Sequence, residues 1–289
     1  MAAEFVDESA TPWSTLGGIG ALRLHAVNRP VRADIRIPGS KSLSNRALII
    51  AAMSDGTARL SGLLRSDDTY WCLDALRRLG VRIDFDRTGN AIVRGIGRTR
   101  PRQGHIYVGS AGTVARFLPP LLAAGDYGKW RITASSQMSG RPMEPLFQAL
   151  ADGGATVSFL DREGCFPVMV TGDTFSGGQL RMSGSVSSQF ISGILMGAPQ
   201  SRHGVVLDID GPIVQSDYVR ITLDVMRHFG LNVDPNQDLR HFDIAPSRYR
   251  SRDLDIEADA STSTYFAALA AATGGRIALT NLGQATRQP

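Results

Sequence analysis

A nine-residue stretch, Pro-Gly-Ser-Lys-Ser-Leu-Ser-Asn-Arg at 38–46, gathers hydroxyls, an ammonium and a guanidinium within a short length of chain. A strand-like run, Val31–Ile37, precedes it, and an apolar run typical of a helix, Ala47–Met53, follows it. The polar groups therefore fall at the start of a helix, where three serines can cap free backbone N–H groups. Those N–H groups and the helix dipole favour a negative charge. The stretch predicts a site for an anion.

Lys41 stands out within this stretch because the chain strongly prefers arginine. Of 31 Lys and Arg residues only two, Lys41 and Lys129, are lysines. A lysine kept among hydroxyls suggests a need for a compact ammonium, although by itself it is equally typical of a solvated surface loop. A nucleotide-binding P-loop is excluded, because Ser40 separates Gly39 from Lys41.

Further segments could contribute to the same chemistry. They are the Gly-Ser-Ala-Gly-Thr turn at 109–113, Arg141 ahead of a helix-starting proline, the Ser-Val-Ser-Ser-Gln stretch at 185–189, and Gln-Ser-Asp-Tyr at 215–218. A turn can direct N–H groups at an oxyanion, and an arginine can grip a carboxylate or phosphate bidentately. Each one alone is as typical of a tight turn, a surface arginine or an N-cap. Asp67 and Asp68 are predicted to be helix-start residues rather than an acid/base pair.

The segments recur because the chain repeats itself. Similar starts lie at 39, 109, 184 and, more loosely, 258, roughly 70 to 75 residues apart. Apolar helices are predicted after them at Ala47–Met53, Phe117–Ala124, Phe190–Met196 and Phe266–Ala272. Strands follow at Ala58–Leu63, Lys129–Ala134, Val205–Ile209 and Arg276–Leu279. Second helices are predicted to end at Gly80, Gly154 and Gly230. The unit is β-α-β-α-β-β, which predicts an α/β (α+β) fold. The length of 289 residues predicts two domains.

The fourth unit stops after its first helix and strand, before Pro289. The repeat therefore predicts that the chain is cut within this unit. A genuine shortened final unit is the alternative.

The composition narrows the class of protein. The net charge is +4, and the basic residues are scattered and not interleaved with aromatics, so small anionic ligands are favoured over nucleic acid. The two cysteines and five histidines fall in no metal-ligand spacing. The N-terminal residues lack an apolar targeting segment, and no run is long enough to span a bilayer. A cytoplasmic protein is predicted.

These motifs together resemble 5-enolpyruvylshikimate-3-phosphate (EPSP) synthase. The residues that carry the resemblance are the Pro-Gly-Ser-Lys-Ser run with Asn45 and Arg46, the 109–113 turn with Arg116, Arg141-Pro142, and the Gly-Ser-Val-Ser-Ser-Gln-Phe run at 184–190. The resemblance implies two domains built from six repeat units. It implies that residues 38–257 form a domain that binds shikimate 3-phosphate, and that 1–37 and 258–289 belong to an incomplete second domain.

The resemblance also implies a reaction and a set of roles. The enolpyruvyl group of phosphoenolpyruvate moves to the 5-hydroxyl of shikimate 3-phosphate and phosphate is released, without a metal or cofactor. Catalytic roles fall to Lys41 and Gln189, with the acid/base carboxylates expected beyond residue 289. Shikimate 3-phosphate is expected at Lys41, Ser42, Arg46, Ser187, Ser188, Gln189, Ser216 and Tyr218. Phosphoenolpyruvate is expected at Lys41, Gly112, Arg141 and Gln189.

The sequence departs from the family pattern at a few positions. Ser216 is displaced by one position from the family's usual serine, and Ser110 and Phe117 replace a common Asn and Pro around the phosphoenolpyruvate pocket. Two alternatives stay open. One is a non-catalytic fragment that binds shikimate 3-phosphate. The other is the sister enzyme acting on UDP-N-acetylglucosamine, disfavoured because 109–145 has no cysteine. The protein is expected to be a monomer, and these 289 residues alone are expected to be inactive.

Overall fold

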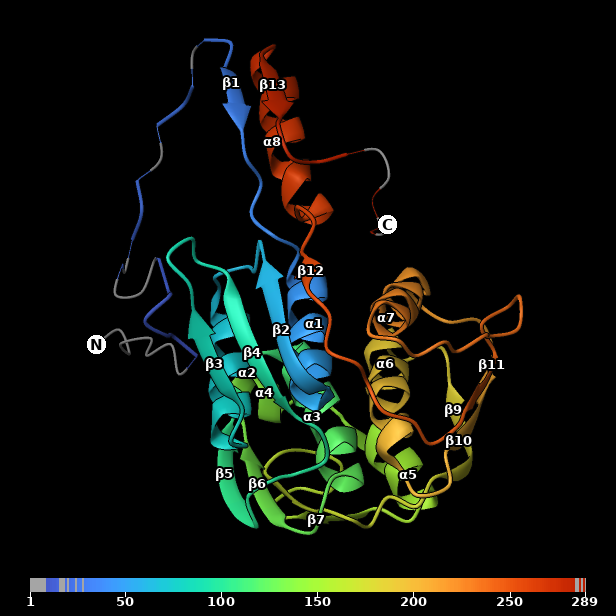
Figure 1. Ribbon diagram of the computed structural model, residues 1–289. Coiled ribbons are helices and arrows are strands. Elements are labelled where there is room, and N and C mark those ends of the chain that lie inside the picture. The colour runs from blue at the N-terminus through green and yellow to red at the C-terminus, as the bar shows by residue number, and fades with distance from the viewer. Residues whose placement is uncertain are drawn as a thin grey trace.

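Three buried helices run side by side through the body of the computed structural model (Figure 1). They are α1 (Lys41–Met53), α3 (Gly112–Ala124) and α6 (Ser188–Gly197). Nearly every residue of each is buried, as expected for helices that are apolar on all sides. Gly193 allows α3 and α6 to pack closely, since a Cβ there would meet the carbonyl oxygen of Arg116 at 2.5 Å. The structure describes residues 9–15, 19, 21–23, 25–27, 29–283, 286 and 288.

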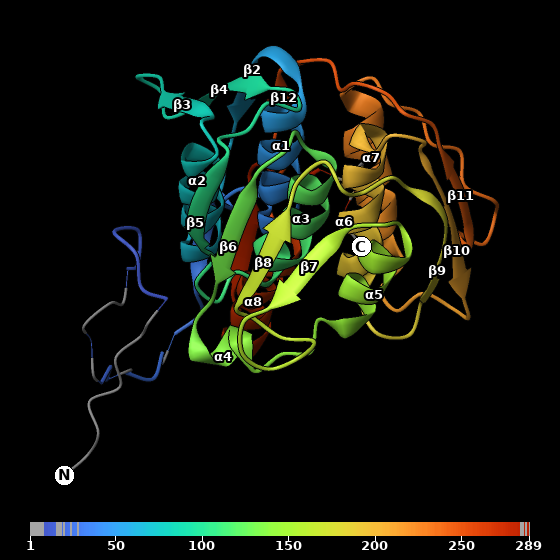
Figure 2. The same ribbon diagram turned by 90° about the horizontal axis from the view of Figure 1, so that it is seen from below.

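Three sheets surround these helices (Figures 1 and 2). The first has the order β12 (Leu254–Asp255), β2 (Asp55–Ser61), β4 (Ala91–Ile96), β3 (Arg82–Phe85). The second is β5 (Gln103–Tyr107), β6 (Lys129–Thr133), β8 (Val168–Thr171), β7 (Thr156–Phe159). The third is β11 (His241–Ile244), β10 (Val205–Asp210), β9 (Gly178–Ser183). Each sheet combines one parallel pair with antiparallel strands, so the predicted mixed α/β fold is confirmed.

The first unit obtains its parallel strand from a distant part of the chain. The strand-like run at 31–37 directly precedes this unit in the sequence but does not supply the strand. Instead β12 pairs with β2, in register Leu254 with Leu60. The structural reason is that residues 32–35, which precede this unit, pair with residues 276–279 instead. Local pattern cannot reveal this, because the two strands lie almost 200 residues apart.

The second helices of the units end in the same way. They are α2 (Asp67–Arg78), α5 (Glu144–Asp152) and α7 (Asp217–His228). Gly80, Gly154 and Gly230 follow them with positive φ values of 87°, 85° and 86°, which glycine adopts without strain. The N–H after each of these glycines returns to a helix carbonyl, for example from Val81 to Leu76 at 3.0 Å. The predicted glycine ends are confirmed.

A smaller part of the chain stands apart from this body (Figure 1). It consists of β1 (Arg32–Ile35), α8 (Ala260–Thr273) and β13 (Arg276–Leu279). β1 runs parallel to β13, with Ala33 opposite Ile277. No residue of α8 is buried. Two short helices, α4 (Ser136–Ser139) and η1 (Ala198–Gln200), complete the described elements. Among all the residues that the structure describes, no helix is long and apolar enough to cross a membrane.

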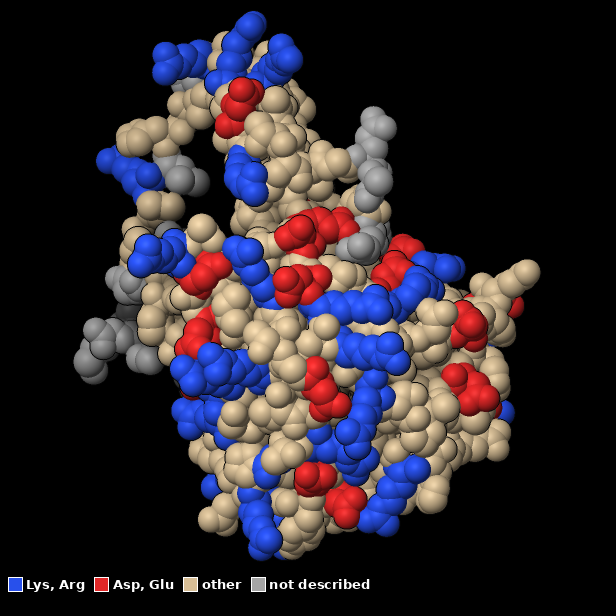
Figure 3. All heavy atoms as spheres, viewed as in Figure 1, with Lys and Arg blue, Asp and Glu red and all other residues tan. Residues whose placement is uncertain are grey.

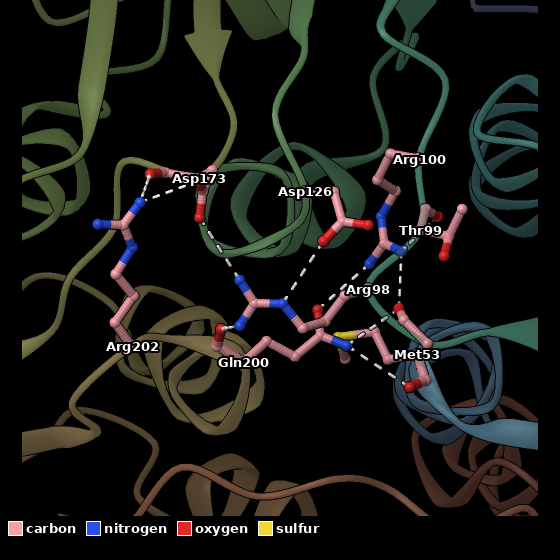
Figure 4. A network of polar contacts seen from close by, with 9 residues as sticks. Met53, Arg98, Thr99, Arg100, Asp126, Asp173, Gln200 and Arg202 are labelled. Atoms are coloured by element: carbon pink, nitrogen blue, oxygen red, sulfur yellow. Dashed lines mark hydrogen bonds and ion pairs between the residues drawn. The ribbon is translucent and has the colours of Figure 1, made fainter.

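A polar network joins the units where the three central helices end (Figure 4). Arg98 donates a hydrogen bond to the carbonyl oxygen of Gln200 and lies 3.7 Å from carboxylate oxygens of both Asp126 and Asp173. The Gln200 side chain donates to the carbonyl of Met53, the last residue of α1, at 3.5 Å. Cations and amides at helix C-termini satisfy free carbonyl groups and complement the helix dipole. The network therefore fixes these helix ends relative to one another.

We expect Arg98→Ala to lower the free energy of unfolding by roughly 1–2 kcal/mol, because it removes a hydrogen bond to a carbonyl and two charge contacts. Urea denaturation would measure the change. Arg78→Ala is the matched control, since it removes only the surface pair with Asp74 and should cost no more than about 0.5 kcal/mol. Equal losses in the two variants would show that Arg98 does not join the units.

Candidate functional site

A cavity of about 630 Å³ lies where the N-terminal ends of α1, α3 and α6 meet. Its lining includes Lys41, Ser42, Arg46, Asp68, Ser110, Gly112, Thr113, Arg116, Arg141, Pro142, Val186, Ser187, Gln189, Phe190, Gln215 and Tyr218. The cavity thus brings together segments from all three repeat units. A second hollow, of about 500 Å³, is lined by apolar side chains such as Phe147 and Phe159 and holds no comparable set of cations.

Lys41 is the first residue of α1 and lies at the cavity edge. Its Nζ forms an ion pair with Asp68 Oδ2 at 3.1 Å, and its side chain remains about half exposed. The prediction that serines cap this helix is wrong. The Ser40 side chain makes no capping bond, and the N–H of Lys41 donates to Asp259 Oδ2 at 3.1 Å. A carboxylate is a stronger acceptor than a hydroxyl, and only the tertiary fold brings Asp259 here.

Arg46 lies beneath the cavity and is almost fully buried. Its guanidinium donates to Thr222 Oγ1 at 2.7 Å and to the carbonyls of Ser42 and Tyr218, at 3.0 and 3.2 Å. It stacks over the Phe117 ring, 5.0 Å from the centroid. All of these partners are neutral, so the positive charge is held in place without being cancelled. Burial lowers the pKa of Arg46 to about 10, which leaves it charged at neutral pH.

Arg116 occupies a comparable position on α3. It is 8% exposed, its Nη1 donates to the carbonyl of Gly112 at 2.8 Å, and it stacks over Phe190 at 5.6 Å. Burial, and then the like charge of Arg141, lowers the pKa of Arg116 to about 10. Neither Arg116 nor Arg141 has an ion-pair partner within the described part of the chain. The second unit thus offers two guanidinium groups without carboxylate partners at one wall of the cavity.

The third unit contributes neutral polar groups. Ser187 is the N-cap of α6, and its hydroxyl accepts from the N–H of Gln189 at 3.2 Å. Gln189 and Tyr218 line the cavity together with Ser187. Ser188 is buried, and Ser216 opens α7 without a side-chain capping bond. These last two serines do not line the cavity, although their types and positions suggested it.

The remaining predicted residues fall as follows. Ser42, Gly112 and Arg141 line the cavity beside Lys41 and Arg46. Phe117, which was expected around the same pocket, lies beneath Arg46 and is 1% exposed. Sequence reasoning did not assign Asp68 or Arg116 to the site. A signal for Arg116 existed, since it follows Gly109 by the same number of residues as Arg46 follows Gly39.

The arrangement can hold negatively charged groups at neighbouring points. Lys41, Arg46, Arg116 and Arg141 supply positive charge, and hydroxyls, an amide and helix N-termini supply hydrogen bonds. Asp68 is the one carboxylate among the described lining residues, and it is paired with Lys41. No three His, Cys, Asp or Glu side chains come together as a metal site in the described ranges.

The fold and the cavity define a protein of repeated α/β units that directs helix N-termini and cations into one hollow. The family profile of EPSP synthase (3-phosphoshikimate 1-carboxyvinyltransferase) matches residues 26–288. The chain belongs to the EPSP synthase family.

Individual relatives agree with this assignment. The chain is 46% identical over 285 residues to 3-phosphoshikimate 1-carboxyvinyltransferase 2 of Halalkalibacterium halodurans, covering 99% of this chain and 63% of that protein. It is 38% identical over 264 residues to 3-phosphoshikimate 1-carboxyvinyltransferase of a Sulfurovum species, covering 90% and 62%. A solved EPSP synthase from Acinetobacter baumannii matches with a TM-score of 0.76 at 26% identity, covering 89% of this chain and 57% of that one. The chain therefore spans less than two thirds of the length of these relatives.

Gly112 lies where a side chain would displace the guanidinium group of Arg116. A Cβ at this position would meet Arg116 Nη1 at 2.7 Å, which is too close, and would touch Arg141 Nη1 at an ordinary contact distance of 3.5 Å. We expect Gly112→Ala to weaken binding of inorganic phosphate about tenfold, because the Arg116 guanidinium must move from its place in the wall. Isothermal titration calorimetry would measure the affinity.

Gly140→Ala is the matched control for this substitution. Gly140 has φ of −74°, and a Cβ there meets nothing closer than 3.6 Å. Its phosphate affinity should equal that of the unmodified chain. Equal affinities in all three proteins would contradict a role for the Gly112 wall in holding anions.

Proposed function

We propose that this chain provides the shikimate 3-phosphate side of an enolpyruvyl transfer site. The proposal rests on one observation above the others. Eight of the ten predicted binding residues, from all three repeat units, line one cavity. Apart from the Lys41–Asp68 pair, its cations have no carboxylate partner among the residues that the structure describes. Membership of the EPSP synthase family supports the same substrates. The proposed reaction moves the enolpyruvyl group of phosphoenolpyruvate to the 5-hydroxyl of shikimate 3-phosphate.

We propose a place for each ligand in the cavity from the family pattern. Shikimate 3-phosphate is assigned to the end with Ser42, Arg46, Ser187 and Tyr218, and to Ser188 and Ser216 only through the family pattern. Phosphoenolpyruvate is assigned to the wall formed by Gly112 and Arg141, extended here by Arg116. Lys41 and Gln189 also line the cavity and are proposed to contact both ligands. Such an arrangement aligns the reactants before reaction, which removes much of the entropic part of the barrier.

The chemistry requires proton transfers in addition to binding. The 5-hydroxyl gives its proton to a base as its oxygen bonds to C2 of phosphoenolpyruvate, the C2–C3 double bond opens, and C3 of phosphoenolpyruvate gains a proton, which gives a tetrahedral intermediate. The bond between C2 and the phosphate oxygen then breaks, C3 gives up a proton to a base, and the C2–C3 double bond forms again. The cationic cavity stabilises the negative charge of the leaving phosphate. Lys41 is proposed to handle one of these protons, and the acid/base carboxylates are expected outside these 289 residues.

The proposal includes a division of the chain into two domains. Residues 38–257 are proposed to form the shikimate 3-phosphate domain, and 1–37 with 258–289 to belong to a second one. The pairing of β1 with β13 supports this division. A monomer that works in the cytoplasm without a metal or cofactor stays a prediction.

Lys41→Ala should weaken binding of shikimate 3-phosphate by ten- to a hundredfold, on the order expected for a lost charge-assisted hydrogen bond. Calorimetry would measure this affinity. Lys129→Ala is a close control, because it removes the chain's other lysine from the exposed start of β6. If shikimate 3-phosphate binds equally well to both variants, or does not bind the unmodified chain, the proposed function is wrong.

Arg46→Lys tests the geometry of the buried cation rather than its charge. A lysine keeps the positive charge but cannot reach the set of acceptors that the planar guanidinium holds. We expect shikimate 3-phosphate to raise the melting temperature of the unmodified chain clearly and that of Arg46→Lys little. Differential scanning fluorimetry would measure both shifts, and equal shifts would remove Arg46 from the binding site.

The 289-residue chain should not release phosphate when given both substrates, because the one described carboxylate in the cavity is paired with Lys41. A continuous phosphate assay would test this. Turnover above the background would refute the assignment of the acid/base groups to other residues, while leaving the binding assignments intact.

A further inference from the structure

A short N-terminal segment, Ser9–Ser14, lies against the start of α2, outside the range that the family profile matches. The hydroxyls of Thr11 and Ser14 both donate to Asp67 Oδ1, at 2.5 and 2.6 Å. Asp67 lies in the first turn of α2, next to the cavity residue Asp68. The segment runs along the α2 and β3 side of the body (Figure 1).

Trp13 anchors this segment through its ring. It packs edge-on against Tyr70 of α2, with centroids 5.6 Å apart, and against Phe85 of β3 at 6.3 Å. The guanidinium of Arg65 lies 5.8 Å from the Trp13 ring. Edge-on aromatic pairs and cation–π contacts each add to the stabilisation from burial. The segment is therefore docked by several independent contacts.

The other end of the segment reaches the wall of the cavity. Ser9 Oγ lies 2.5 Å from Oγ of Ser110, which lines the cavity. The indole N–H of Trp71 donates to the carbonyl of Ser9 at 3.0 Å. Trp71 also covers Gly109 so closely that a Cβ there would meet its Nε1 at 2.4 Å. Ser9 and Trp71 thus hold the turn at 109–112 from its outer side.

The inner side of this turn has its own support. The N–H of Ser135 donates to the carbonyl of Gly109 at 3.0 Å, and the hydroxyls of Ser110 and Ser135 lie 2.7 Å apart. Ser135 and Ser9, from two different segments, therefore both contact the hydroxyl of Ser110 in this turn. A small displacement of the turn would move Gly112, which lies beside the guanidinium groups of Arg116 and Arg141.

We propose that Ser9–Ser14 is an intramolecular strap that positions the 109–112 turn and thereby the anion-binding wall of the cavity. Ser9 and Trp71 are positioning residues, since they act through Ser110 and Gly109. The consequence for ligands rests on the proposed function, in which this wall receives phosphoenolpyruvate. Binding of shikimate 3-phosphate, assigned to the opposite end, should depend little on the strap.

Amide hydrogen exchange tests the strap without reference to any ligand. Trp13→Ala removes the anchor, and Ser9→Ala removes the contact with Ser110. In both variants the amides at 109–113 should exchange about tenfold faster, because the turn opens more often. The corresponding turn of the third unit, at 184–188, is the internal control and should be unchanged. Tyr127→Ala is the matched aromatic control, because Tyr127 is 60% exposed and lies outside the strap and the cavity lining.

The ligand measurement then separates the two proposals. With excess shikimate 3-phosphate, the affinity for phosphoenolpyruvate should fall at least about threefold in both strap variants, and the affinity for shikimate 3-phosphate should not change. Unchanged exchange at 109–113 would overturn the strap whatever the ligands do. Faster exchange with an undiminished affinity for phosphoenolpyruvate would overturn its effect on the site. Faster exchange in a chain that binds neither ligand would leave the strap standing and refute the proposed function.

Discussion

The structure depends on buried positive charge that the protein does not neutralise. Arg46 is enclosed by neutral acceptors and an aromatic ring, and burial lowers its pKa to about 10. Burial therefore makes the charged form less favourable in the fold than in the unfolded chain. This cost is present at every pH below about 10 and declines only above it, where the folded arginine loses its proton. An anion bound beside the guanidinium would offset part of this cost, so the same charge that opposes folding favours binding.

The three central helices hold the buried guanidinium group of Arg46 in place. They are apolar on nearly all sides, so their packing is dense enough to hold a guanidinium in one orientation. Because they lie side by side, their N-terminal ends reach one cavity and their C-terminal ends reach one polar network. Arg98 and Gln200 at that lower end complement the carbonyl groups, as the cavity cations would be complemented by an anionic ligand. Hydrogen-bond donors and positive charge therefore stabilise the C-terminal ends of the helices, and a bound anion would stabilise the N-terminal ends.

Charge over the rest of the surface is distributed differently. On the face seen in Figure 3, lysines and arginines are interspersed with aspartates and glutamates, and many form the surface pairs that contribute little to stability. At the helix N-termini Arg46, Arg116 and Arg141 face the cavity, and none of them has an ion-pair partner in the described part of the chain. The strap at Ser9–Ser14 adds a contact to one wall of this cavity from outside the three units.

The sequence by itself determined the repeat, the element types and eight of the residues that line the cavity. Gly80, Gly154 and Gly230 predicted the helix ends, because only glycine adopts the left-handed backbone there easily. The hydroxyl-rich helix starts predicted where cations and N–H groups would gather. Only the tertiary structure decided which partners those groups meet. The cap of α1 comes from Asp259, the parallel partner of β2 comes from β12, and Lys41 pairs with Asp68. These contacts join residues far apart in the chain, and local periodicity carries no information about them because it reports only which face of each element is apolar.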